Sequence, residues 1–149
     1  MVIDLKKLRQ RGEETAPFEF VFTPDKELLT IPNADFAENA KVSGTVEVYK
    51  DKAFITGFVE FGIVGQCSRC LKPAEKSIKV EFDEEFRPAP CEDEEVNSYV
   101  NDRIDLNELI AQLILTNLPY TIYCTDDCKG LCPTCGKNLN DGECGCDKN

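Results

Sequence analysis

The chain has 149 residues, of which 42% are hydrophobic and 9% aromatic, and this length fits a single hydrophobic core but not two full-sized domains. Its 17 Lys and Arg residues against 28 Asp and Glu residues give a net charge of −11, and no apolar run reaches the roughly 20 residues that cross a bilayer. Residues 1–12 carry charges throughout and lack the apolar centre of a signal peptide. We therefore expect a soluble, acidic, cytoplasmic protein.

Most of the chain before residue 90 shows the period-two alternation of β-strands. Apolar residues alternate with polar ones over 42–48 and again over 53–61, with Lys50-Asp51-Lys52 between them, which is typical of a hairpin. Residues 78–86 alternate in the same way and predict a third long strand. Two shorter strands are expected at 18–22 and 28–31. Together these segments predict an antiparallel sheet of about five strands.

One amphipathic helix is expected near residues 105–118. Asp105 is suited to cap it, with Glu108 three residues on, and Pro119 ends the pattern. Apolar residues follow at helical spacing up to Ile114, and this stripe must pack on the sheet. The fold class is therefore α+β: residues 1–123 form a β-rich core with one packed helix, and 124–149 form a cysteine-rich zinc-knuckle tail docked on that core.

The negative charge is concentrated in one segment. Residues 81–108 contain eleven acidic residues and two arginines, a net charge of −9, and the prolines at 88 and 90 indicate a solvated loop in its middle. Basic residues gather near the N-terminus and just after the long hairpin. A local positive patch acts over roughly 8 Å at physiological salt, so the net charge alone does not exclude an anionic partner.

The cysteines carry the clearest chemical signal. The chain has nine cysteines and no histidine, and in a reducing compartment such cysteines indicate metal thiolates before disulfides. Zinc prefers four tetrahedral ligands, so eight paired cysteines match two four-cysteine sites. Only Cys91, in the acidic loop, is left over. The eight expected ligands are Cys67, Cys70, Cys124, Cys128, Cys132, Cys135, Cys144 and Cys146.

The tail has too few apolar residues to fold by burial. After Cys124 its only large apolar side chains besides cysteine are Leu131 and Leu139, whereas ordering the backbone costs about 1–2 kcal/mol per residue. A structural zinc site contributes roughly 10–16 kcal/mol in small peptides. We expect one site at residues 132, 135, 144 and 146 and the other at 67, 70, 124 and 128, although an exchange of cysteine pairs between the sites stays open.

Several motifs together resemble the YceD-like family, the large ribosomal RNA subunit accumulation proteins. They are Cys67-Ser-Arg-Cys70-Leu71, the helix from Asp105 that closes with Leu118-Pro119, the segment Cys128-Lys-Gly-Leu-Cys-Pro-Thr-Cys-Gly-Lys-Asn-Leu-Asn140, and Cys144-Gly-Cys146. The resemblance implies a bacterial or plastid cytoplasmic protein that is needed for normal levels of large-subunit ribosomal RNA. It implies no catalytic residues, and the cysteines alone carry over, with a structural role.

Two routes to such a role follow from the charges. The protein could contact ribosomal RNA precursor directly, since lysine and arginine make most phosphate contacts, or its acidic segment could hold a basic large-subunit ribosomal protein. The sequence favours neither route over the other, and both can operate in one complex. The candidates for contact with RNA or another partner are Lys6, Lys7, Arg9, Arg11, Arg69 and Lys72.

Two other classes of function compete with this interpretation. A thiol redox enzyme is disfavoured because its CxxC pair normally opens a helix, whereas Cys67 and Cys70 end a strand and Pro73 follows. Hydrolysis lacks a histidine base, and a closed four-thiolate zinc site has no open position for substrate. We therefore expect no enzymatic activity, and the remaining alternative is a zinc-stapled interaction module of another nucleic-acid machine, such as transcription.

Overall fold

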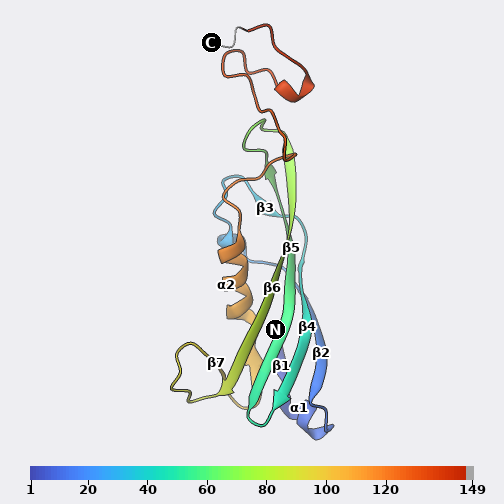
Figure 1. Ribbon diagram of the computed structural model, residues 1–149, viewed down its shortest axis with the longest axis vertical. Coiled ribbons are helices and arrows are strands. Elements are labelled where there is room, and N and C mark those ends of the chain that lie inside the picture. Colours follow the sequence, from blue (N-terminus) through green and yellow to red (C-terminus); the bar gives the residue numbers. More distant parts are fainter. Residues whose placement is uncertain (147–149) are drawn as a thin grey trace.

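A six-stranded sheet forms the centre of the computed structural model, which describes residues 1–146 (Figure 1). Neighbouring strands are antiparallel except for the last pair, β6 and β7, which is parallel. The short strand β3 (Asp35–Phe36) pairs with β5 beyond the end of β4. The antiparallel sheet expected from the sequence is thus confirmed. The main strands, in spatial order, are β2 (Thr15–Phe22), β4 (Ala40–Tyr49), β5 (Lys52–Gln66), β6 (Pro73–Pro88) and β7 (Asn97–Tyr99).

The alternation in the sequence places apolar side chains on one face of this sheet. Val42 lies opposite Val59, and Val46 opposite Ile55, and all four are buried. Helix α2 (Asn107–Asn117) covers this face and adds buried Ile110 and Ile114. The opposite face, which we call the open face, carries polar residues because successive side chains point to opposite sides of a strand. Members of the open face are Lys41, Thr45, Thr56, Glu60, Glu75, Ser77, Lys79 and Glu81.

Helix α2 ends where the sequence predicts, but its N-cap position is Leu106, whose side chain makes no capping hydrogen bond, and not Asp105. The Asp105 carboxylate accepts a hydrogen bond of 2.9 Å from the backbone N–H of Asn107 at the helix start. The helix ends at Asn117, two residues before Pro119. The main packed helix expected near residues 105–118 is confirmed.

The strand expected at residues 28–31 is wrong. A short 3-10 turn, η1 (Lys26–Leu28), occupies its start, and the Asp25 side chain accepts the N–H of Glu27 at 3.0 Å to begin it. Leu29 and Ile31 still pack against the core. Apolar residues can therefore be buried from a loop, and this is why their alternation alone did not specify a strand.

The N-terminal segment has order that the sequence analysis missed. Strand β1 (Val2–Asp4) pairs with β8 (Arg103–Asp105), and helix α1 (Leu5–Gln10) follows at once. This helix has a short apolar face formed by Leu5 and Leu8, which are buried. The charged residues between them obscure this face in the sequence. The Asp4 carboxylate accepts the N–H of Lys7 and caps this helix.

The molecule is elongated along the direction of the long hairpin β5–β6 (Figure 1). The cysteine-rich segment extends from one end of this hairpin, whereas α1 and the β4–β5 turn lie at the other end. The 3-10 turn η2 (Leu139–Asp141) lies within the cysteine-rich segment. Neither α1 nor α2 has the length and apolar character to cross a membrane, and these are the α-helices of the described residues.

Two facing glycines generate a test of the sheet. A Cβ atom on Gly44 would lie 2.1 Å from the Thr56 carbonyl oxygen, and one on Gly57 would lie 2.4 Å from the Ser43 carbonyl oxygen. Because either Cβ must force β4 and β5 apart, we expect Gly44→Ala and Gly57→Ala each to lower the free energy of unfolding by about 1–3 kcal/mol, measured by urea denaturation at constant zinc.

The exposed neighbour on β4 provides the matched control. Thr45→Ala should cost less than about 1 kcal/mol. Wild-type stability in both glycine variants would contradict the close approach of the two strands.

Candidate metal centres

The first four-cysteine cluster joins the end of the long hairpin to the C-terminal segment. Cys67 and Cys70 lie in the turn between β5 and β6, and Cys124 and Cys128 follow α2 in the chain. The Sγ atoms of Cys67 and Cys128 are 3.7 Å apart, and those of Cys70 and Cys124 are 3.5 Å apart. All except Cys124 are buried. The cluster thus ties two distant parts of the sequence together.

The second cluster lies wholly within the C-terminal segment. It contains Cys132, Cys135, Cys144 and Cys146, and the four Sγ atoms, like those of the first cluster, lie within 4.8 Å of one another. Cys135 is exposed and Cys132 is buried. Both groups of four match the pairing that the sequence favoured, without exchange between sites. The expected tail ends in residues 147–149, which lie outside the described residues.

The two CxxC turns have the same backbone hydrogen bonds. The N–H of Cys67 donates to the Lys72 carbonyl at 2.8 Å, and the N–H of Leu71 donates to the Cys67 carbonyl at 2.9 Å. In the second turn the N–H of Cys132 donates to the Lys137 carbonyl at 2.8 Å, and the N–H of Gly136 donates to the Cys132 carbonyl at 2.9 Å. Two unrelated places in the sequence thus form one local structure.

Each turn needs a left-handed residue just after its second cysteine. Gly136 has φ of 73° there, and Leu71 has φ of 62°. Glycine adopts this conformation at little cost, whereas leucine is strained in it. Leu71 is also 58% exposed, so its burial does not offset the strain.

The spacing of the sulfur atoms fits a tetrahedral metal ion. Four thiolates at the zinc–sulfur distance of about 2.3 Å would place their sulfur atoms about 3.8 Å apart. The 3.5 Å and 3.7 Å separations in the first cluster agree with this value. A disulfide would need about 2.05 Å, and all nine cysteines are free thiols. The residues present therefore fit a four-thiolate metal site.

Backbone N–H groups prepare one cysteine of each cluster for ionisation. Burial raises the pKa of Cys67, but N–H groups of Cys70, Cys124 and Arg69 outweigh burial and lower this pKa to about 6. In the second cluster N–H groups of Cys135 and Thr134 lower the pKa of Cys132 to about 6. Since metal ions bind the thiolate, these amides favour the ligand form of both sulfur atoms.

Another cysteine of each cluster holds its proton because it faces other sulfur atoms. Hydrogen bonding to Cys70 raises the pKa of Cys124 to about 12. Hydrogen bonding to Cys135 likewise raises the pKa of Cys146 to about 12. Four adjacent sulfur atoms cannot all carry negative charge unless a cation replaces these protons, and a metal ion would serve that purpose.

Two of the expected partner-binding residues contact the cysteine-rich segment from the end of the long hairpin. The Arg69 guanidinium lies over the Tyr123 ring, 4.4 Å from its centroid, and donates to the Cys128 carbonyl at 3.1 Å. The Lys72 ammonium pairs with the Asp141 carboxylate at 3.0 Å. Arg69 and Lys72 therefore fasten the hairpin end to the cysteine-rich segment.

The N-terminal basic residues lie at the opposite end of the molecule (Figure 1). Arg9 forms an ion pair with Asp102 and contacts the Tyr99 hydroxyl at 3.4 Å. Lys6, Lys7 and Arg11 are exposed on or beside α1. The structure therefore does not gather the six basic candidates into one surface.

Sequence reasoning missed the residues that support the clusters. Tyr123 supports Arg69, Asp141 pairs with Lys72, and the Asn140 side chain donates to the Cys128 Sγ at 3.3 Å. Asn140 stands in the motif quoted above, but nothing in its spacing indicates contact with a sulfur of the other cluster. Such contacts depend on how the two turns pack in three dimensions.

Removing ligands from the first cluster tests these centres. We expect Cys67→Ser with Cys70→Ser to halve the metal content per chain, because the second cluster keeps its four thiolates. Elemental analysis after reconstitution with zinc measures this content. Cys91→Ser is the matched control, since Cys91 belongs to neither cluster. A full metal content without Cys67 and Cys70 would contradict the assignment.

Comparison with known proteins places the chain in a family. Uncharacterized proteins of Mycobacterium bovis and Mycobacterium tuberculosis are each 30% identical over 146 residues, covering 93% of this chain and 70% of the relative. An uncharacterized protein of Mycobacterium leprae is 29% identical over 100 residues, covering 63% of this chain and 46% of the relative. No solved structure matches. The family model described as "Large ribosomal RNA subunit accumulation protein YceD" matches residues 55–149, and the chain therefore belongs to the YceD family, as the motifs indicated.

Proposed function

We propose that this protein is a non-enzymatic factor of large-subunit ribosome biogenesis that binds a basic protein of the large subunit through its acidic surface. The family description supports the ribosomal role. The observation that carries the choice of partner is that four exposed carboxylates of the β6–β7 loop form no ion pair within residues 1–146, whereas Arg9, Arg69 and Lys72 contact other residues of the chain. We place this activity in the cytoplasm, where thiols stay reduced.

The two clusters are proposed to bind zinc in a structural role. Zinc supplies a fixed tetrahedral crosslink and no redox change. Eight thiolates and two zinc ions would add four negative charges to the chain's −11. A loaded protein would therefore repel RNA more strongly and attract a basic protein more strongly.

Thiol redox catalysis has little support from the first cluster. Cys67 is 0% exposed and shares its surroundings with three other sulfur atoms. A substrate disulfide could not reach it without opening the turn. Its lowered pKa therefore fits ligation better than catalysis.

The loop between β6 and β7 contributes the first part of the acidic surface. Glu92, Asp93, Glu94 and Glu95 are exposed, and none forms an ion pair within residues 1–146. The Asp93 carboxylate accepts only the backbone N–H of Glu95, at 3.1 Å. This loop projects from the side of the sheet (Figure 1). Its four carboxylates are thus free to meet a cationic partner.

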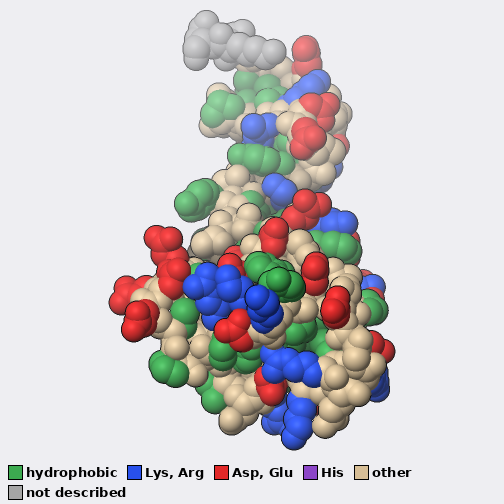
Figure 2. Space-filling view, turned by 60° about the horizontal axis from the view of Figure 1, so that its bottom comes forward, with side chains coloured by type: hydrophobic (Ala, Val, Ile, Leu, Met, Phe, Trp, Pro, Cys, Tyr) green, Lys and Arg blue, Asp and Glu red, His purple; other side chains and the backbone are tan. Residues whose placement is uncertain are grey.

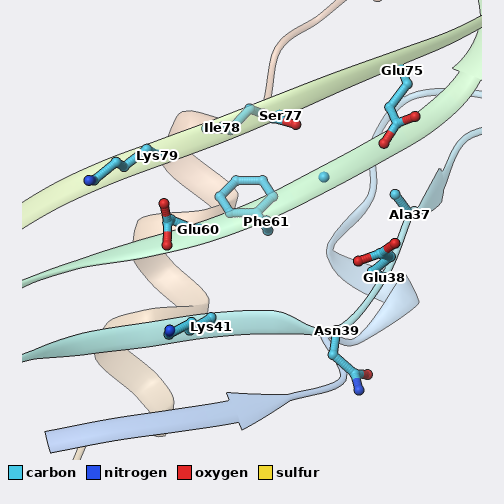
Figure 3. A pocket seen from close by; sticks show the side chains of 11 residues that line it. Ala37, Glu38, Asn39, Lys41, Glu60, Phe61, Glu75, Ser77, Ile78 and Lys79 are labelled. Atoms are coloured by element: carbon cyan, nitrogen blue, oxygen red, sulfur yellow. The ribbon is translucent and has the colours of Figure 1, made fainter.

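A shallow hollow on the open face contributes the second part (Figure 3). Glu38, Glu60 and Glu75 lie around it, and no ion pair joins them to the described residues. Two lysines also line the hollow: Lys41 pairs with Glu19 at 2.9 Å and interacts with the charge of Glu60 on the neighbouring strand, and the Lys79 ammonium lies 3.7 Å from the Phe58 ring centroid. With three carboxylates against two ammonium groups, the hollow has a small excess of negative charge and adds less to the acidic surface than the β6–β7 loop does.

Direct RNA contact is a second candidate because three of the expected basic residues are exposed close together in the sequence. Lys6, Lys7 and Arg11 belong to the α1 end of the molecule. Figure 2 looks toward this end and shows Lys and Arg side chains beside projecting Asp and Glu side chains. Phosphate would have to approach past these carboxylates. The charges therefore favour a basic protein.

Charge neutralisation in the β6–β7 loop tests the proposed function. Glu92→Gln, Asp93→Asn, Glu94→Gln and Glu95→Gln together should weaken capture of large-subunit ribosomal proteins by about tenfold or more, because charge pairs across the interface are lost. Binding is measured with the immobilised full chain against separated large-subunit proteins and against large-subunit ribosomal RNA.

A control variant removes the same charge elsewhere. Glu13→Gln, Glu14→Gln, Glu27→Gln and Asp127→Asn change exposed residues outside the loop and should leave capture nearly unchanged. If the loop variant captures proteins normally while Lys6→Gln, Lys7→Gln and Arg11→Gln abolish RNA capture, the RNA route is the correct one.

A further inference from the structure

One side chain from the loop that carries the second cluster, that of Asn140 in the turn η2, reaches a sulfur atom of the first cluster. Asn140 lies in the chain between Cys135 and Cys144, which belong to the second cluster, yet its Nδ2 donates to the Cys128 Sγ of the first cluster at 3.3 Å. The contact crosses from one candidate metal centre to a sulfur ligand of the other. Hydrogen bonds from outer groups to ligand atoms orient the ligands and tune metal affinity.

Every polar group of the Asn140 side chain is used in this position. Its Nδ2 also donates to the Asn138 Oδ1 at 2.8 Å, so both amide hydrogens have acceptors. Its Oδ1 accepts the N–H of Lys129 at 2.8 Å. Lys129 follows Cys128 directly, so Asn140 holds both the sulfur and the adjacent backbone. An aspartate could replace the acceptor but not the donor.

The position of Asn140 depends on the second cluster. The turn η2 lies in the chain between the Cys132–Cys135 and Cys144–Cys146 pairs. Backbone contacts join the segment before it and its own start to residues 130–132: Asn138 forms an antiparallel bridge with Leu131, and the Leu139 N–H donates to the Gly130 carbonyl at 2.9 Å. On its far side Asp141 pairs with Lys72, and the chain then continues to Cys144 and Cys146. The Lys72 and Asp141 side chains are 52% and 59% exposed, and such a pair stabilises little. Without a metal ion in the second cluster, the chain between Cys135 and Cys144 would lose order, and Asn140 would no longer be held in one position.

We propose that Asn140 couples the two metal centres, so that metal in the second cluster raises the affinity of the first. The inference rests on the metal occupancy proposed above. When Asn140 is held in place, its side-chain amide donates a hydrogen bond to the Cys128 sulfur. When Asn140 is disordered, this hydrogen bond is lost and the sulfur is exposed to solvent. By thermodynamic linkage the first cluster must raise the affinity of the second by the same factor.

Site-resolved zinc release tests the coupling. The zinc-loaded full chain is titrated with a chelator, and alkylation of each cysteine is read by mass spectrometry, which gives a separate release midpoint for each cluster. In Cys135→Ser with Cys146→Ser, which lacks the second centre, we expect the first cluster to release zinc at about 10–100-fold lower chelator concentration. Asn140→Ala should cause a similar shift with the second centre intact.

Combined and matched variants identify Asn140 as the connection. Adding Asn140→Ala to the variant without the second centre should cause no further shift, because both changes remove the same hydrogen bond. Asn140→Asp keeps the acceptor for Lys129 and should still weaken the first cluster. Asn117→Ala is the control, since Asn117 also donates its amide, at 2.9 Å to the Leu113 carbonyl, but lies on α2 away from both clusters.

The outcomes separate this inference from the metal proposal. Cysteines that are all alkylated without chelator would overturn the zinc proposal itself. The coupling alone would be overturned if both clusters are protected but the first cluster releases zinc at the same chelator concentration with and without the second centre. Release at the wild-type concentration from the first cluster in Asn140→Ala or Asn140→Asp would overturn it as well.

Discussion

The structure depends on how a segment without a hydrophobic core is held in place. Between residues 124 and 146 only Leu131 and Leu139 offer large apolar side chains besides cysteine, and both are only partly buried. Hydrophobic burial therefore cannot offset the entropy of ordering this backbone. Eight convergent sulfur atoms in two groups provide the alternative, since a structural metal site can supply the missing free energy. The ion pair of Lys72 and the stacking of Arg69 on Tyr123 then align the segment with the hairpin.

The long hairpin determines where that segment lies. Strands β5 and β6 are 15 and 16 residues long, and they extend past the part of the sheet covered by α2 (Figure 1). Cys67 and Cys70 at the tip hold the chain as it returns from α2, so the cysteine-rich end stands apart from the acidic loop between β6 and β7. One end of the molecule is thus crosslinked by sulfur, while the open face and the acidic loop stay available for a partner.

The sequence predicted the structure correctly where a residue type or a pattern of residues has one common structural role. Cysteine pairs without histidine predicted both groups of four ligands, and regular alternation predicted β4, β5 and most of β6. It failed where tertiary packing decides: Leu29 and Ile31 are partly buried in a loop, and Leu5 and Leu8 form an apolar helix face among charged residues. Arg69 and Lys72 show the same limit, because a sequence gives the charge of a side chain but not the Cys128 carbonyl or the Asp141 carboxylate that engages it.

We propose that each cluster surrounds one metal ion with four sulfur atoms and no other ligand. X-ray absorption at the zinc edge of the purified, zinc-loaded full chain tests it most directly. Four-thiolate coordination predicts a single shell of four sulfur atoms at about 2.3 Å with no nitrogen or oxygen neighbour. A mixed shell containing oxygen or nitrogen, or fewer than four sulfur atoms per zinc, would contradict it.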